Sequence, residues 1–466
     1  MMPHRGLKVL GICLFPIWIF SFGSPLCEKQ VLKREGPART IVIQAAGRGY
    51  PWVNFAAGRS LEVRFAEDSD GAARFEELQA AGLVEPLSLA AGDFDEDGVP
   101  DLVCGYGAAG GGVVTLHGGN VDSIFPNSPE AWQRKRAGTF TPEPFFAPRQ
   151  LLELSEAPEF LATGNFDFDS NLDIVAASRR SSTLYLYPGN GLGGFTEVQM
   201  VPIPGLPTAL VAGEVNRRDG LQDLVVGVVT DEGPRLLVFE SLKGALRDEP
   251  EVFDLPFAAT DFAIGHLDGN YPLDLAVAAG QQLMIVHGRD RRLYLDEERR
   301  GNVPAAEVER YSYSRTIHSL AIGKFSDPWH PQIALLFDDG SVRLMERSEE
   351  TSTQTFREAD DFRLPIGAAA LTSASSSSLQ LITARVSSIP QDDLIVVDRG
   401  TRQLHVLFGF GDEGGRRPAA VLSPAPRLAS LDMVGAPVAV LPMRLNEDAL
   451  SDLVVLNSHP NPLGVL

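Results

Sequence analysis

A short acidic turn between two apolar runs, repeated along the chain, is the feature that most constrains the fold. Its clearest copy is LAAGDFDEDGVPDLVCGY at residues 89–106. Aspartates stand at positions 1, 3, 5 and 9 of the turn: Asp93, Asp95, Asp97 and Asp101. Calcium takes about six to eight oxygen ligands, which these carboxylates, the carbonyl of Val99 and water would supply. Leu102 to Cys104 is typical of a strand. We therefore expect a calcium loop inside a β-hairpin, with a solvated acidic turn as the alternative.

The same pattern returns six times. The seven turns, named loops 1 to 7, lie at residues 93–101, 165–173, 214–223, 266–274, 324–332, 385–393 and 444–452. In loops 2, 3 and 4 the candidate metal ligands are Asn165, Asp167, Asp169, Asn171 and Asp173, then Glu214, Asn216, Asp219 and Asp223, then Asp268, Asn270 and Asp274. The closing positions are 50 to 72 residues apart, which favours the blades of a β-propeller over helical repeats of about 33–47 residues.

The later loops lose acids and gain basic residues. Loops 5 and 6 have lost most of the pattern, and loops 4 to 7 begin with His266, Lys324, Arg385 and Arg444. A positive charge stabilises neighbouring carboxylates as a bound cation would. The hypothesis is that these residues replace calcium in loops 4 to 7.

These units resemble the FG-GAP, or VCBS, repeats of integrin-α-like β-propellers, in which the acidic loop joins the first two strands of a blade. The resemblance implies an all-β, seven-bladed propeller over residues 61–466 that binds a protein or glycan on the face opposite the metal loops. The expected ligand loops there include Gly107–Gly112, Arg179–Ser182, Asp231–Gly233, Asp338–Ser341 and Arg399–Arg402. Arg179, Arg180 and Arg402 are the candidate contacts for an acidic ligand.

The two ends of the repeat region complement each other. Strand patterns at Leu61–Phe65 and Ala73–Leu78 have no first half of a blade before them, and the chain ends soon after loop 7. We expect these N-terminal strands to complete the last blade and close the ring, which removes exposed sheet edges. Residues 24–60 are a lead-in of undefined structure.

The N-terminus and the composition indicate export and exclude some partners. Residues 1–23 combine a basic start with an apolar stretch of 14 residues, Val9 to Phe22, which predicts a signal peptide, cleaved or retained as an anchor. We expect a secreted, extracellular or periplasmic protein, free or attached to a surface, without direct membrane insertion after cleavage. A net charge of −21 in 466 residues argues against nucleic acid. Cys104 is expected to be a buried thiol, and Cys27 is its one candidate disulfide partner outside the signal.

Other motifs are structural. The G-x-G-x-x-G at residues 105–110 precedes another β-type run, so it predicts a hairpin turn and no nucleotide site. Ser128-Pro129-Glu130 followed by AWQRKR predicts a capped helix inserted between loops 1 and 2. Residues 289–311 are expected to be a charged surface insertion, and Ser375 to Ser378 a loop.

The sequence thus predicts a secreted, calcium-binding recognition module with an unidentified protein or carbohydrate ligand. No catalytic motif is present, and no enzyme is expected. The alternatives are a polysaccharide lyase or glycoside hydrolase on the same propeller, or a spacer in a surface assembly.

Overall fold

The computed structural model describes most of the repeat region and parts of the N-terminal segment. The described residues are 28–32, 39–40, 42–43, 53, 59–61, 75, 77–79, 81–216, 219–291, 298, 302–347, 356–364, 379–410, 426–458 and 463–465. The predicted signal at 1–23, Cys27 and the serine run at 375–378 lie outside them. No helix among the described residues is long and apolar enough to cross a membrane.

Strands account for nearly all of the regular structure. Six sheets follow each other along the described chain, each with four consecutive antiparallel strands. Sheet 1 holds β5 (Glu85–Gly92), β6 (Asp101–Ala108), β7 (Gly111–Gly119) and β8 (Phe145–Leu154). Sheet 2 holds β9 (Phe160–Gly164), β10 (Asp173–Ala177), β11 (Thr183–Tyr187) and β12 (Gln199–Pro202). Sheet 3 holds β13 (Leu206–Gly213), β14 (Asp223–Thr230), β15 (Gly233–Phe239) and β16 (Glu251–Asp254).

The second half of the chain repeats this order. Sheet 4 holds β17 (Ala259–Gly265), β18 (Asp274–Ala279), β19 (Gln282–Val286) and β20 (Val308–Ser312). Sheet 5 holds β21 (Ile317–Gly323), β22 (Gln332–Phe337), β23 (Ser341–Arg347) and β24 (Phe356–Arg363). Sheet 6 holds β25 (Leu379–Ala384), β26 (Asp393–Asp398), β27 (Gln403–Phe408) and β28 (Arg427–Asp432). A smaller sheet 7 holds β29 (Pro437–Met443), β30 (Asp452–Asn457), β31 (Leu463–Val465) and β4 (Arg59–Leu61).

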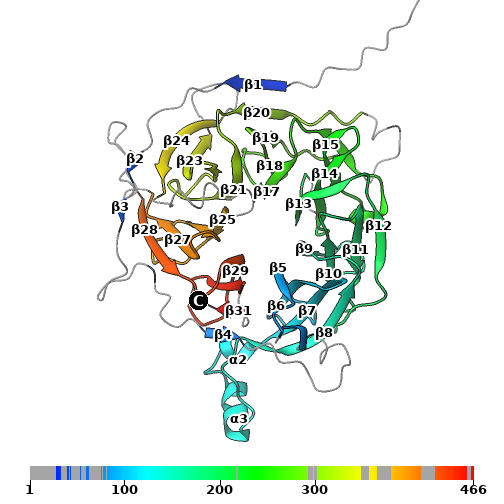
Figure 1. The fold of residues 1–466 in the computed structure, drawn as a ribbon, viewed down its shortest axis with the longest axis vertical. Coiled ribbons are helices and arrows are strands. Elements are labelled where there is room, and N and C mark those ends of the chain that lie inside the picture. Colours follow the sequence, from blue (N-terminus) through cyan, green and yellow to red (C-terminus); the bar gives the residue numbers. More distant parts are fainter. Residues whose placement is uncertain are drawn as a thin grey trace, which may run out of the picture.

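The sheets stand around a common centre, with the first strand of each sheet innermost (Figure 1). This is the all-β propeller that the repeats predict. Loops 1 to 7 join the first and second strands of their sheets, as expected.

The core lies between neighbouring sheets. The second strands are buried on both faces, because each is covered by a sheet on either side. Leu102 and Cys104 of β6 pack toward sheet 7, whereas Val103 packs toward sheet 2. Cys104 is a free, buried thiol, as predicted. The described residues form one such apolar cluster between each pair of adjacent sheets.

The N-terminal segment runs along the outside of four sheets, which the sequence does not predict. Strands β1 (Glu28–Leu32), β2 (Arg39–Thr40) and β3 (Val42–Ile43) pair in parallel with β20, β24 and β28 (Figure 1). β4 then pairs antiparallel with β31. These outer strands cover three sheet edges and complete a fourth sheet.

Two expectations for the segments around the sheets are wrong in part. Residues 75 and 77–79 are helical, where a strand is expected at Ala73–Leu78. Phe75 and Leu78 recur at helical spacing, and the Phe75 ring packs at 5.2 Å from that of Tyr106. The predicted insertion at 289–311 ends inside β20, so its last residues belong to sheet 4.

Other local predictions are confirmed. α3 (Pro129–Ala137) follows the short helix α2 (Val121–Ile124), and the Ser128 hydroxyl caps it by accepting the Ala131 N–H at 3.0 Å. The glycine-rich stretch at 105–110 is the β6–β7 hairpin. A short 3₁₀ turn, η1 (Ala245–Arg247), follows β15.

Candidate metal centres

The last aspartate of loops 1 to 4 is a backbone clamp, because its side chain accepts backbone N–H groups. In loop 1, Asp101 accepts the Phe94 N–H at 3.0 Å and the Gly119 N–H at 2.8 Å, so it ties the loop to the end of β7. Asp173 and Asp274 make the equivalent pairs of bonds in loops 2 and 4. In loop 3, Asp223 accepts the Val215 N–H. Sequence reasoning predicts these aspartates as metal ligands and misses this structural role.

Loop 1 brings three carboxylates together above this clamp. Asp93, Asp95 and Asp97 each offer an oxygen, and these atoms lie within 4.8 Å of one another. The Asp93 oxygens accept the N–H groups of Asp97 and Gly98 at 3.0 and 2.9 Å. Gly98, at position 6 of the turn, has a φ of 86°, a left-handed conformation that favours glycine. Val99 is buried, and its N–H donates to Asp97.

Loop 2 has the same backbone shape without a glycine. Phe168 and Ser170 take left-handed φ values of 71° and 77° at positions 4 and 6, matching Glu96 and Gly98 of loop 1. Non-glycine residues adopt this conformation at a cost in energy, so the loop is held in it by its contacts. The Asn165 side chain accepts the Phe168 N–H at 3.0 Å. The backbone N–H and the side-chain amide of Asn171 both donate to Asp169.

The acids of loop 2 are crowded. Asp167, Asp169 and Asp173 bring oxygens within 4.8 Å of one another. Burial and the neighbouring Asp169 raise the pKa of Asp167, and burial raises the pKa of Asp173 to about 7. An oxygen-only donor set at this spacing fits calcium, because oxygens bound at about 2.3–2.6 Å lie up to about 5 Å apart. Loops 1 and 2 therefore both fit the predicted ion.

Loop 3 is arranged differently. The Asn216 side chain donates to Glu240 at 2.7 Å and accepts the Arg289 N–H at 3.1 Å, so it links sheets 3 and 4. Arg291 lies 3.3 Å from Glu240. Burial and Glu240 raise the pKa of Asp223 to about 9. Among the described residues, Glu214, Asp219 and Asp223 do not bring three ligand atoms together.

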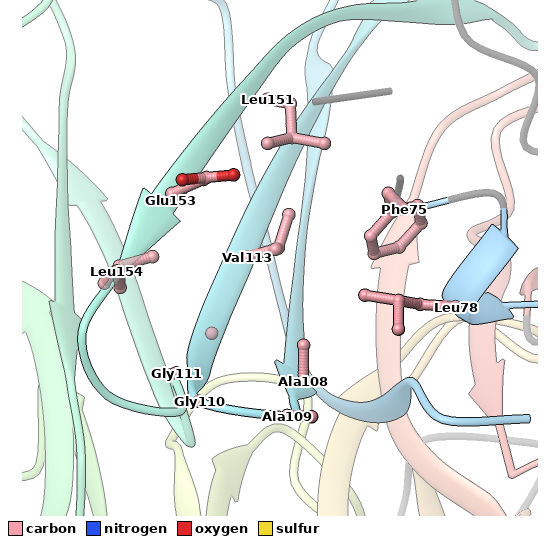
Figure 2. Close-up of a pocket in the computed structure, with 11 residues that line it drawn as sticks. Phe75, Leu78, Ala108, Ala109, Gly110, Gly111, Val113, Leu151, Glu153 and Leu154 are labelled. Atoms are coloured by element: carbon pink, nitrogen blue, oxygen red, sulfur yellow. The ribbon is translucent and has the colours of Figure 1, made fainter. Parts of the chain in front are cut away.

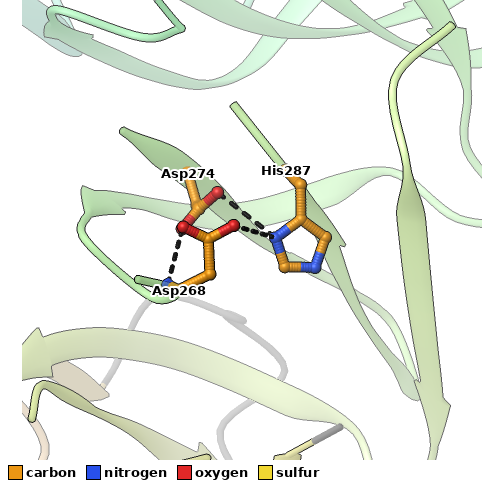
Figure 3. A group of neighbouring side chains, drawn as sticks. All are labelled: Asp268, Asp274 and His287. Atoms are coloured by element: carbon orange, nitrogen blue, oxygen red, sulfur yellow. Dashed lines mark hydrogen bonds and ion pairs between the residues drawn. The ribbon is translucent and has the colours of Figure 1, made fainter. Parts of the chain in front are cut away.

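The acids of loop 4 meet a histidine from outside the loop that the sequence analysis misses. His287, just after β19, places Nδ1 3.3 Å from Asp268 and 3.3 Å from Asp274 (Figure 3). Its Nε2 lies 3.3 Å from Glu309 of β20. Burial alone would lower the pKa of His287, but hydrogen bonds with the three acids raise it to about 11. The predicted Asn270 donates to Asp268 instead of joining the cluster.

The acids of loop 4 have a cation beside them that the hypothesis about the first-position residues does not name. This is His287 at the end of the third strand, whose Nδ1 lies 3.3 Å from Asp268. Lys324, Arg385 and Arg444 are exposed, and no ion pair of theirs is present among the described residues. Loop 5 has the neutral Gln332 at its clamp, and in loop 6 the Ser387 hydroxyl donates to Asp393.

Of the three arginines on the predicted ligand face, Arg179 has a structural role. The guanidinium of Arg179 donates to Thr208 at 2.9 Å and stacks on Phe160 at 4.4 Å, so it joins sheets 2 and 3. Arg180 and Arg402 are exposed in their hairpin turns. The Gly107–Gly112 hairpin borders a cavity of about 150 Å³ with Phe75 and Leu154 (Figure 2). That volume is below the range of about 300–1,000 Å³ usual for small-molecule pockets.

The metal-loop face exposes large apolar side chains. Tyr271 and Trp329 both stand at position 6, in loops 4 and 5, and are 67% and 81% exposed. Phe168 of loop 2 is 65% exposed. Large contiguous apolar patches mark interaction surfaces, whereas single exposed apolar side chains are common.

Comparison with known proteins gives one family match and several similar folds. Residues 86–117, which hold β5, loop 1 and most of β7, match the FG-GAP repeat family. Among solved structures, BBS1N in complex with ARL6DN, soaked with mercury, aligns with a TM-score of 0.48 and 11% identity over 81% of this chain and 90% of that one. The Cps50 (Swd1) β-propeller domain of Myceliophteria thermophila aligns with a TM-score of 0.45 and 8% identity over 82% and 95%. No curated protein matches the chain.

Proposed function

Starting from an FG-GAP repeat built into an all-β, integrin-α-like propeller, we propose that this chain is a secreted, calcium-stabilised recognition module for another protein. Secretion rests on the signal pattern at residues 1–23. The net charge of −21 favours a basic or apolar partner over an acidic one.

The proposal includes seven blades in a closed ring, with sheet 7 as the seventh blade. Two contacts support closure. The β4–β31 pairing joins the chain's N-terminal region to its last strand. Met443 and Leu445 of the last sheet pack in one cluster with Leu102 and Tyr106 of the first sheet.

Calcium in loops 1 and 2 is the second part of the proposal. Asp93, Asp95 and Asp97 would hold the ion in loop 1, and Asp167, Asp169 and Asp173 would hold it in loop 2. Bound calcium would neutralise crowded carboxylates and fix both left-handed turns. Phe168 of the exposed face stands in loop 2, so calcium in that loop would fix the position of Phe168.

The exposed aromatic side chains of the metal-loop face carry the recognition proposal. Tyr271 and Trp329 stand in equivalent positions of neighbouring sheets and contribute nothing to the core at these exposures. Aromatic side chains supply much of the binding energy of protein interfaces. These side chains support a partner on the metal-loop face, and the opposite face, with Arg180 and Arg402, is the alternative.

A photocrosslinking experiment tests the face. A photoreactive amino acid replaces Trp329 in the exported protein, or Arg402 as the matched probe on the other face. Crosslinked partners are then identified on cells that make the protein. We expect a protein crosslinked from position 329 that is lost when Tyr271 and Phe168 are changed to alanine. Crosslinking from position 402 alone would assign recognition to the opposite face, and crosslinking to a glycan would replace the protein partner.

Thermal melting tests the calcium part separately. Ligand linkage predicts about 2.7 kcal/mol of stabilisation for one site at a hundred times its dissociation constant. We expect excess calcium to raise the melting temperature relative to excess chelator, and Asp95→Ala and Asp167→Ala each to reduce that shift. An equal melting temperature in calcium and in chelator would refute calcium binding and leave the acidic turns solvated.

The enzymatic alternative would be located near loop 4. A cavity of about 600 Å³ borders His287, Glu309 and Asp268, and thus brings acids and a base together. A polysaccharide lyase or hydrolase would work there, and its activity on acidic and neutral polysaccharides would be abolished by His287→Gln. The recognition proposal predicts no such activity.

A further inference from the structure

The acid cluster of loop 4 differs from loops 1 and 2 because it contains a nitrogen ligand. We propose that His287, Asp268 and Asp274 form a binding site for Zn²⁺ or a related first-row divalent ion (Figure 3). The zinc site is independent of the calcium proposal, since it concerns a different loop and a different ion.

The orientation of the imidazole supports a cation at this point. Glu309 lies 3.3 Å from Nε2, and in the tautomer that carries its proton on Nε2 the imidazole presents the Nδ1 lone pair to the two aspartates. Nδ1 lies 3.3 Å from Asp268 Oδ2 and 3.3 Å from Asp274 Oδ1. These three atoms converge within 4.8 Å. Metal binding between them would displace the Nδ1 proton, because a histidine ligand is neutral.

The distances between the ligand atoms fit a bound metal ion. A tetrahedral zinc ion with bonds of about 2.0–2.1 Å keeps neighbouring ligand atoms roughly 3.3–3.4 Å apart. The two 3.3 Å separations match the edges of such a tetrahedron.

The surrounding groups hold the ligands in place. Asp274 Oδ2 accepts the N–H groups of Leu267 and Asp268 at 2.8 and 3.1 Å. Asp268 Oδ1 accepts the Asn270 N–H at 2.9 Å. The Tyr311 hydroxyl donates to Glu309, which in turn orients the ring of His287. A carboxylate behind a metal-bound histidine is the usual support of such ligands.

The cavity beside the cluster leaves room for a further ligand. Asp268 and His287 line the cavity of about 600 Å³, together with Arg289 and Glu309. With three protein ligands, a tetrahedral ion keeps one position for water or a small oxygen ligand. The nitrogen donor favours zinc over calcium, which binds oxygen.

The test uses the full-length mature protein in saturating calcium, so that loops 1 and 2 are filled. Zn²⁺ is titrated by calorimetry, and Co²⁺ serves as a spectroscopic probe of tetrahedral nitrogen and oxygen ligation. We expect one Zn²⁺ per chain and a tetrahedral Co²⁺ spectrum. His287→Gln should weaken binding by at least about 100-fold, and the supporting change Glu309→Gln by about 10–100-fold.

His330→Gln is the matched control, because His330 forms an exposed ion pair with Asp327 outside the cluster. It should bind zinc as the unchanged protein does. Asp268→Asn keeps the side-chain shape and provides a second test if His287→Gln does not fold. A folded protein that binds no zinc, or zinc binding unchanged in both His287→Gln and Asp268→Asn, would overturn the proposal. His287 would then be a protonated partner of the three acids.

Discussion

At the scale of single residues, the acidic loops contain two kinds of aspartate. Asp95 belongs to the converging carboxylates of loop 1, whereas Asp101 is 1% exposed and accepts two backbone N–H groups from different parts of the chain. A buried donor left without an acceptor costs about 1–3 kcal/mol. The two residues look alike in the sequence, but in the structure Asp95 belongs to the carboxylate cluster and Asp101 accepts backbone hydrogen bonds.

This difference predicts that the stability loss depends on calcium for Asp95→Ala but not for Asp101→Ala. Asp101→Ala should lower the free energy of unfolding by about 2–5 kcal/mol with or without calcium, because it leaves the buried N–H groups of Phe94 and Gly119 without their acceptor. Asp95→Ala should lower it only when calcium is present. Denaturant unfolding of both variants in calcium and in chelator measures this. A calcium-dependent loss for Asp101→Ala alone would contradict the assignment.

At the scale of strands, side chains of the innermost strands join neighbouring sheets. Asp261 of β17 accepts the Leu320 N–H of β21 at 3.1 Å and a hydrogen bond from the Ser319 hydroxyl. Ser319 in turn accepts the Leu381 N–H of β25 at 2.9 Å. This chain of bonds links sheets 4, 5 and 6 next to the centre of the ring.

The buried Asp261 also predicts a pH dependence. Burial raises its pKa to about 6 in the folded protein, above its ordinary value of 3.8. A raised folded pKa means that the folded state holds the proton more tightly, so this group favours folding most below about pH 4 and loses that contribution as the pH rises to about 6.

Asp261→Asn removes this titration. The free energy of unfolding of the unchanged protein should therefore fall, relative to the variant, by up to about 1.4 kcal/mol per pH unit between pH 4 and pH 6. Denaturant unfolding at several pH values measures the difference. A difference that is constant over this range would show that Asp261 titrates at its ordinary pKa.

At the scale of the whole molecule, the N-terminal segment binds the ring from outside. It adds parallel strands to sheets 4, 5 and 6 in turn and enters sheet 7 through β4. A sheet edge covered in this way is protected from pairing with other chains. The segment predicted as a lead-in is thus part of the propeller.

A cysteine pair tests closure of the ring. Ser60 of β4 is the register partner of Gly464 in β31, and paired antiparallel residues lie within disulfide distance. Ser60→Cys with Gly464→Cys should form a disulfide and add about 2–4 kcal/mol to stability. Thiol labelling and melting in oxidant and in reductant measure both effects.

Ser60→Cys combined with the exposed Ser458→Cys is the out-of-register control and should stay reduced. Crosslinking of the control pair but not of the designed pair would mean that the chain closes elsewhere.

The features of the fold that could be predicted from the sequence are those that depend on local patterns. The acidic turns, the capped helix α3 and the β6–β7 hairpin each depend on residues close together in the sequence, and each forms where expected. The helical residues 75 and 77–79 and the strands β1 to β3 were not predicted, because short segments take their structure from the surface they pack on.

The sequence by itself determined the repeat, the propeller architecture and the position of each acidic loop, because spacing and hydrophobic pattern are local properties. The tertiary structure alone decided what each loop does. The Asn216 side chain donates to Glu240, and His287 contacts Asp268 although 19 positions separate the two residues in the sequence. Loop and third strand meet only when the sheet has formed, so the partner of each carboxylate is set by strand register and not by the loop's own sequence.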